Sequence, residues 1–471
     1  MKKYFLLSTV LASLFGCAKL DVTPESAFTP DNFYGNLNDA TAAVNAVYDP
    51  LGTNDFYWQN IPSLQDQSTD DAEWGGGRST ANTSKNELDR YTFTPSTITF
   101  FQVWTRCYQG INRANAVIDR ISGISGNEDL KTRLVGEAKF ARAFYYFSLV
   151  RLYGGVPLST SETKELNNLA RPRASVDEVY QRIITDFSDA ETALPLRYAG
   201  SDVGRATQGA AKALLAKVYL TRGEWTAASA KCKEVIDLGV YDLWANYGDV
   251  FLLANENGKE SIFEVQAISG GLNEGSAMQG YFRPSFDRAG FGDNPVTRNH
   301  YEAYPTGDKR RDVNTRLYSR TTAPIAPNAI AYPCYVAKYQ DPTATSNNDG
   351  ANNFPVVRYA DVLLMYAEAL NEQGTGTANA YAAVNRLRRR AGLADLGGLT
   401  QGQFRDAILL ERRLELAFEG HRWYDLVRTG RLISAVRAQN ATIPVQPYHV
   451  LFPIPQTERD VNPLLDQNPD Y

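Results

Sequence analysis

The chain has 471 residues, with 48 lysines and arginines against 53 aspartates and glutamates, so its formal charge at neutral pH is -5. A small negative charge spread over so long a chain provides no basic face, which excludes nucleic acid as a partner. Three of the four cysteines, Cys107, Cys232 and Cys334, lie far apart without CxxC spacing, so at most one disulfide is possible among them and buried thiols are favoured over a thiolate zinc site.

The chain begins with an export signal. Lys2 and Lys3 precede twelve mostly apolar residues, 4–15, a run too short to cross a bilayer. The following stretch LFGC, ending at Cys17, resembles a bacterial lipobox, a signal in which the cysteine is acylated and becomes the first residue. We therefore expect residues 1–16 to be removed and Cys17 to hold the chain on membrane lipid, with plain secretion as the alternative.

Helical periodicity dominates both ends of the mature chain. Apolar residues recur at helical spacing in 38–51, 101–121, 129–153, 175–194, 206–221 and 225–238, and again in 359–372, 378–391 and 400–428. Ser175 and Glu178 form a capping box, which marks one helix start. Gly420 is expected to break the last of these helices.

Two long segments, 52–96 and 241–355, are rich in Gly, Asn, Asp, Ser and Pro. Loops of such length are uncommon in compact domains unless they have a function. The predicted organisation is therefore a signal peptide (1–16), a helical N-terminal part (17–240), a loop-rich insertion (241–355) and a helical C-terminal part with a tail (356–471).

The helices contain a repeated hairpin pattern. In ALLAKVYLTRGEWTAASAKCKEVIDLG, Tyr219, Gly223, Trp225 and Ala228 have the order and spacing of a tetratricopeptide unit. LLMYAEALNEQGTGTANAYAAVNRLRRRAG predicts a second hairpin, and GEAKFARAFYYFSLVRLYGGVP a third, looser helix. Such units bury their apolar faces by stacking, so several should lie side by side; generic antiparallel helices are the alternative.

Four segments carry a family resemblance. They are AKFARAFYYFSLVRLYGGVPL, RYADVLLMYAEALNE, ERRLELAFEGHRWYDLVRTGRL and LFPIPQTERDVNPLLDQNPDY. In this order, over nearly the whole mature chain, they resemble the signatures of the SusD/RagB family of Bacteroidetes outer-membrane lipoproteins.

The resemblance implies a mainly α fold of tetratricopeptide-like hairpins with long irregular loop insertions and little strand. It also implies a binding protein without catalysis or cofactor, which faces the cell exterior and passes captured oligosaccharide or polysaccharide to a SusC-like TonB-dependent β-barrel transporter. A scaffold for other proteins and a binder of another nutrient, such as peptide, are the alternatives.

Aromatic residues in the two insertions are candidate glycan contacts. A sugar ring presents C–H groups that pack well on an aromatic face, and neighbouring polar groups can hold its hydroxyls. The candidates are Trp58, Asp71, Trp74 and Arg78 in the first insertion and Tyr281, Phe286 and Phe291 in the second. Glycines surround Trp74, so it ranks first, and Trp58 could share one shallow platform with it. The alternative is that each ring pins its loop to the body.

Glu411, Glu415 and Glu419 recur every four residues and predict one acidic stripe, with Arg412, Arg413 and Arg422 expected to pair with it. A pair of carboxylates can hydrolyse glycosides, but neighbours on one stripe seldom flank a substrate, so structural ion pairs are favoured. The sequence contains no HExxH, GxSxG or Walker motif, and we expect no metal or cofactor.

Overall fold

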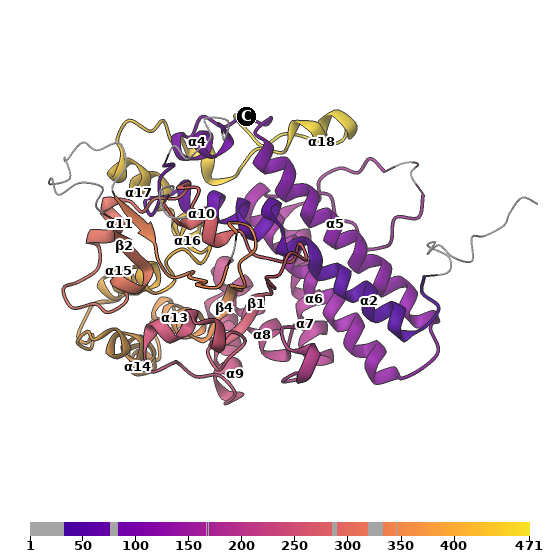
Figure 1. Cartoon of the computed structure of the whole chain (residues 1–471), viewed down its shortest axis with the longest axis horizontal. Coiled ribbons are helices and arrows are strands. Elements are labelled where there is room, and N and C mark those ends of the chain that lie inside the picture. The colour runs from indigo at the N-terminus through magenta and orange to yellow at the C-terminus, as the bar shows by residue number, and fades with distance from the viewer. Residues whose placement is uncertain are drawn as a thin grey trace, which may run out of the picture.

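The computed structural model describes residues 33–75, 83–165, 167, 169–284, 290–318, 333–344 and 346–471. Cys17, Arg78 and Phe286 lie outside these residues. The described part is mainly helical, with short strands only in the middle of the chain, as predicted (Figure 1). None of its helices combines the length and the hydropathy that crossing a bilayer requires.

The N-terminal half is a group of packed helices. They are α2 (Leu37–Tyr48), α5 (Ile98–Arg120), α6 (Glu128–Tyr153), α7 (Val176–Ala193), α8 (Gln208–Thr221) and α9 (Trp225–Asp237). From α5 to α9 each helix packs on the next one along the chain. α5 and α6 approach so closely at Gly110 that a Cβ there would lie 2.1 Å from the Tyr145 ring.

The predicted helical hairpin is confirmed at α8 and α9. Gly223 takes a left-handed φ of 72° in the turn, and the Glu224 N–H donates to the Tyr219 carbonyl (2.9 Å). Ala228 is fully buried where the helices meet. The capping box of Ser175 and Glu178 is also present at the start of α7.

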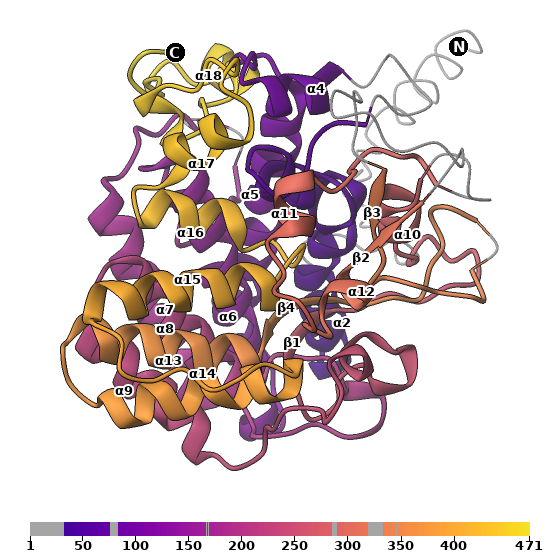
Figure 2. The same ribbon diagram turned by 90° about the vertical axis from the view of Figure 1, so that its left-hand side faces the viewer.

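The C-terminal helices extend the same stack. α13 (Tyr359–Glu372) packs on α9 although more than a hundred residues separate them, and α14 (Thr377–Ala391) and α15 (Gln401–Glu415) pack on α13 (Figure 2). The chain then turns through α16 (Arg422–Arg428), α17 (Leu432–Gln439) and α18 (Gln456–Val461). The predicted break is confirmed, since Gly420 has a φ of 75° between α15 and α16.

The two insertions are built from short elements. The first contains η1 (Asp49–Gly52), η2 (Asn54–Trp58), α3 (Asn60–Pro62), η3 (Ser63–Gln67) and α4 (Thr83–Arg90). The second contains η6 (Tyr247–Phe251), η7 (Leu253–Asn255), β1 (Ser261–Val265), α10 (Met278–Phe282), α11 (Arg298–Glu302), α12 (Arg311–Asn314), β2 (Thr315–Leu317), β3 (Cys334–Val336) and β4 (Phe354–Arg358). The remaining short turns are η4 (Ile121–Gly123), η5 (Gly200–Asp202) and η8 (Pro447–Val450).

Two small antiparallel sheets organise the second insertion. β1 pairs with β4, with Ser261 opposite Arg358 and Val265 opposite Phe354. β2 pairs with β3, with Thr315 opposite Val336. The first sheet therefore brings the two ends of the insertion together at the start of α13.

The described cysteines Cys107, Cys232 and Cys334 are free and buried, as the sequence favours. Burial raises the pKa of the Cys334 thiol to about 12, so this thiol stays protonated.

Candidate functional site

The two insertions meet along a short stretch of paired backbone. Ala72 and Val296 form an antiparallel bridge, the Glu73 N–H donates to the Pro295 carbonyl (3.0 Å), and the Thr297 N–H donates to the Asp71 carbonyl (3.0 Å). These segments lie more than two hundred residues apart in the sequence. The pairing therefore joins the candidate residues of the first insertion to those of the second, which the sequence had indicated only as two separate groups.

Trp74 and Phe291 lie at one end of this stretch. Their neighbours Gly75 and Gly292 touch, because a Cβ on Gly75 would lie 2.2 Å from the Gly292 carbonyl oxygen. The Phe291 N–H donates to the Gly280 carbonyl (2.7 Å), and the ring packs so closely on Gly280 that a Cβ there would lie 2.9 Å from Phe291 Cε2. Both side chains are partly exposed. The described structure thus brings together the backbone segments that carry two of the predicted rings, and both rings keep some accessible surface.

Trp58 and Tyr281 are placed differently from the prediction. Trp58 is 2% exposed, and its ring packs 3.5 Å from the Cβ position of Gly52. Tyr281 is fully buried, its hydroxyl lies 2.8 Å from Ser63 Oγ, and the Lys85 ammonium lies 4.6 Å from its ring centre. Both rings pin the insertions to the body, so the predicted platform shared by Trp58 and Trp74 does not form.

Asp71 is also buried and holds the fold. Its Oδ1 lies 2.7 Å from Arg413 Nε and 3.0 Å from His300 Nδ1. Burial raises the pKa of Asp71, but Arg413 and His300 outweigh burial and lower the pKa below the usual range. Its neighbour Asp70 accepts two hydrogen bonds from Arg422, each 2.8 Å long. Because Asp71 is only 1% exposed, a sugar hydroxyl cannot reach its carboxylate.

Asp89 is a second buried carboxyl close to Trp74. It accepts a hydrogen bond from the Trp74 backbone N–H, and Glu73 lies near enough to repel it. Burial raises the pKa of Asp89 to about 7, against the opposing attraction of Arg90. The loop that carries Trp74 is thus held by a group that titrates near neutral pH.

The acidic stripe after residue 410 lies inside the protein, not on its surface. Glu415 is fully buried and is surrounded by Arg310 (3.2 Å), Arg358 (2.7 Å) and Arg390. Burial raises its pKa, but the three guanidinium groups outweigh burial and lower the pKa below the usual range. A carboxylate held in this way keeps no proton to donate at neutral pH, which a general acid requires.

Glu419 and Glu411 belong to the same network. Glu419 pairs with Lys338 (2.8 Å) and Arg358 (2.7 Å), and burial lowers the pKa of Lys338 to about 8. Glu411 pairs with Arg310 and with Arg388 (3.0 Å).

The predicted partners of these glutamates were wrong. Arg412 pairs instead with Asp361 and Asp425, both at 2.9 Å, while Arg413 and Arg422 pair with the aspartates of the first insertion. Residues one or two positions apart on a helix point in different directions, so Arg412 and Arg413 cannot face Glu411. The true partners come from β4, α14 and the second insertion.

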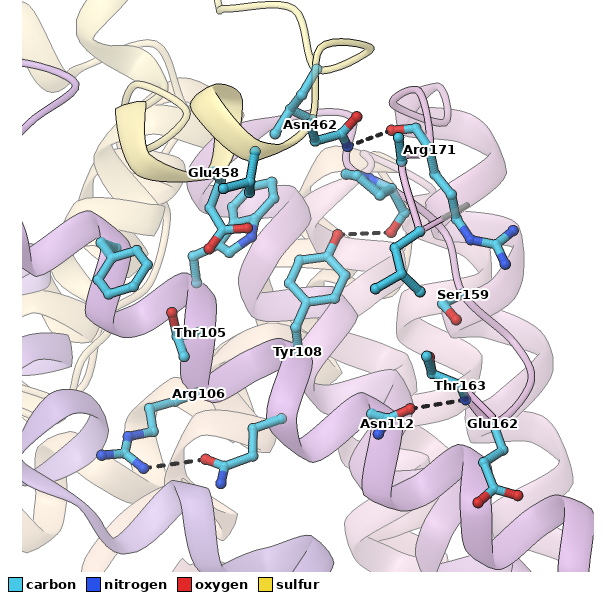
Figure 3. A pocket seen from close by; sticks show the side chains of 18 of the residues that line it. Thr105, Arg106, Tyr108, Asn112, Ser159, Glu162, Thr163, Arg171, Glu458 and Asn462 are labelled. Atoms are coloured by element: carbon cyan, nitrogen blue, oxygen red, sulfur yellow. Dashed lines mark hydrogen bonds between the residues drawn. The ribbon is translucent and has the colours of Figure 1, made fainter. Parts of the chain in front are cut away.

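The described structure also contains a groove of about 940 Å³ that the sequence did not indicate. α5 forms its floor, the segment after Pro157 forms one wall, and α18 with the tail forms the other (Figure 3). The Tyr108 hydroxyl donates to the Pro157 carbonyl (2.7 Å), and the Asn462 amide donates to the Arg171 carbonyl (2.8 Å). The local sequence signal that could have pointed to the groove is a polar face along α5 opposite its buried face.

Comparisons with known proteins agree with this architecture. A model of the SusD family matches residues 311–471, and a family model described as starch-binding associating with outer membrane matches residues 20–220. SusD-like protein P25 of Formosa agariphila is 30% identical, over 97% of this chain and 96% of the relative.

Solved structures match over similar lengths. A laminarin binding SusD-like protein is 30% identical with a TM-score of 0.82, over 93% of this chain and 100% of that one. Surface glycan-binding protein A from Bacteroides thetaiotaomicron, in complex with laminarihexaose, is 25% identical with a TM-score of 0.79, over 92% of this chain and 99% of that one. The chain belongs to the SusD-like family, which confirms the resemblance found in its sequence.

Proposed function

We propose that this protein captures glycan at the cell surface and passes it to a partner TonB-dependent β-barrel in the outer membrane. The main support is the full-length similarity to a laminarin binding SusD-like protein. Further support comes from the surface where the two insertions meet, because it presents the rings of Trp74 and Phe291.

The geometry suits binding of a neutral sugar chain. Aromatic faces contribute contact area at little entropic cost, whereas hydroxyl contacts largely exchange water for protein. The backbone that carries Trp74 is held by the hydrogen bond from Glu73 to Pro295 and by the one from Trp74 to Asp89, so little ordering accompanies binding. A lipid on Cys17 would keep this site near the barrel at high effective concentration.

The test is retention without turnover. The soluble chain from Ala18 onward is incubated with labelled neutral oligosaccharides, including laminarihexaose, and binding is measured by calorimetry while product release is followed by chromatography. We expect saturable binding of at least one glycan and no shortened product. Release of shortened product would instead indicate a hydrolase, and binding of neutral peptides alone would indicate another nutrient.

A further inference from the structure

We propose that the groove over α5 is a second binding site, for a neutral linear oligosaccharide. This inference rests on the proposed function, since it assigns the same class of ligand to a separate surface. The groove lies on α5, α18 and the segment after Pro157, whereas Trp74 and Phe291 lie on the two insertions. Its volume of about 940 Å³ is at the upper end of the range of ligand pockets, about 300–1,000 Å³.

A row of amide groups follows the floor of the groove. Gln102, Gln109 and Asn112 lie on one face of α5, at helical spacing, and line the hollow. Ten residues separate the first from the last, so the row is about 15 Å long. A row of this length suits an extended chain better than a single small molecule.

The amides are oriented by the protein itself. The oxygen of Gln102 accepts from Asn60 (3.0 Å), that of Gln109 accepts from Arg106 (3.2 Å), and that of Asn112 accepts from the Thr163 N–H (3.2 Å). Each side-chain oxygen is therefore in use, while the NH₂ groups have no partner among the residues that the structure describes. The floor is a row of hydrogen-bond donors whose direction is already set.

The opposite wall supplies acceptors and the floor supplies ring surface. Glu458 on α18 is partly buried, and the Trp104 indole hydrogen-bonds to its carboxyl group. Phe101 and Tyr108 are partly exposed beside the amide row. A sugar chain fits this combination because each hydroxyl both donates and accepts and each ring has an apolar face. An extended peptide fits less well, since its N–H groups would find no free amide oxygen along α5.

The charges of the groove favour a neutral ligand. Its lining contains four carboxylates and three cationic side chains. Arg106 is paired with Asp55 (2.7 Å), and Glu162 is paired with Arg120. No cluster of one sign remains that would attract a phosphate or an acidic sugar.

The proposal can be tested by asking whether a bound ligand protects a thiol in the groove from a maleimide. Cys107, Cys232 and Cys334 are buried, and the chain from Ala18 lacks Cys17, so a cysteine replacing the exposed Thr105 provides a single accessible thiol in the groove. The rate of its reaction with a maleimide is measured in laminarihexaose, maltohexaose, an acidic hexasaccharide or a neutral hexapeptide. The matched control is Thr226→Cys, an exposed position on α9.

We expect a neutral hexasaccharide at about four times its Kd to slow the reaction of Thr105→Cys about fivefold, because the free groove falls by the factor 1 + [L]/Kd. Thr226→Cys should react at an unchanged rate. Protection should persist when Trp74→Ala is added. It should be lost when Gln109→Glu and Asn112→Asp are added, since these keep the accepting oxygens and remove the NH₂ donors.

Other outcomes overturn the proposal. Glycan binding that Trp74→Ala abolishes, without protection of Thr105→Cys, would remove the groove site and leave the proposed function in place. Absence of both binding and protection with every sugar would contradict both. Protection by the peptide or the acidic sugar alone would show that the groove takes another ligand.

Discussion

Glu419, in the turn after α15, and Arg358, at the end of β4, form an ion pair with both side chains almost completely buried and with 2.7 Å between Oε2 and Nε. The pair connects the C-terminal helices to the strand that closes the second insertion. Because Lys338 and Glu415 join it, the interior of the protein contains a charge network rather than an isolated pair.

The first prediction is that this network contributes to stability and not to ligand binding. Glu419→Gln or Glu415→Gln leaves buried cations without full compensation, which costs about 3–5 kcal/mol. Asp237→Asn, which breaks the exposed pair with Lys233, is the control and should leave the stability nearly unchanged, because water and salt screen an exposed pair. Denaturation curves measure the loss, and calorimetry on the folded variants should give unchanged glycan affinity. Normal stability with abolished binding would contradict the structural role.

The second prediction separates the two tryptophans of the first insertion. Trp74→Ala should weaken glycan binding roughly tenfold, about 1.4 kcal/mol, with little change in the melting temperature. Trp58→Ala should do the reverse, because it empties a core position, at a cost of about 3–5 kcal/mol. Calorimetry and melting curves on both variants decide the matter. Full affinity in Trp74→Ala would remove this surface as the site.

The third prediction concerns pH. The pKa of Asp89 is about 7 in the folded protein and 3.8 in the reference state, so the native state binds more protons between these values. The free energy of unfolding therefore falls as pH rises from about 4 to about 7, by up to about 4 kcal/mol. Asp89→Asn cannot ionise and should be more stable than the natural protein at pH 8 but not at pH 4. A gain that does not vary with pH would refute this account.

The fourth prediction concerns location. Replacing Cys17 by alanine removes the predicted acylation site, so the protein should leave the outer-membrane fraction while its melting temperature stays the same. Fractionation with a carbonate wash measures this. A variant that remains with the outer membrane would show that another segment holds it there.

The fifth prediction is a stable complex with a large β-barrel. Stacked helical hairpins present a broad surface, which suits a permanent partner. Affinity purification from detergent-solubilised outer membranes of the source bacterium should recover a TonB-dependent transporter together with this chain. Recovery of the chain alone would argue against a barrel partner.

Local sequence determined much of the helical architecture. The predicted helices 359–372 and 225–238 match α13 and α9 to within one residue, because their periodicity and turn residues are local features. The break at Gly420 was also predictable. The close contact that requires glycine there was not, because a Cβ on Gly420 would lie 2.1 Å from Oε1 of the distant residue Gln65.

Features that depend on distant contacts were not predictable. Whether a loop tryptophan is exposed depends on what packs against it, and the sequence around Trp58 gives no sign of its contact with Gly52. Arg358 and Arg390 reach Glu415 from other elements, so the neighbouring arginines were the wrong choice. The groove was missed because α18 and α5 lie more than three hundred residues apart.

The pairing of β1 with β4 also determines which part of the sequence can be replaced without disturbing the helices. Ser261 and Arg358 lie opposite each other, so the chain leaves the helical body and returns to it at one place. The entropic cost of closing a loop grows only slowly with its length, so the largely exposed turn 268–274 between these strands can be lengthened, shortened or exchanged at little cost to the helices. A segment from a relative that replaces this turn and keeps Arg310 and Lys338, the buried partners of the glutamates, is therefore a practical way to transfer ligand preference onto this scaffold.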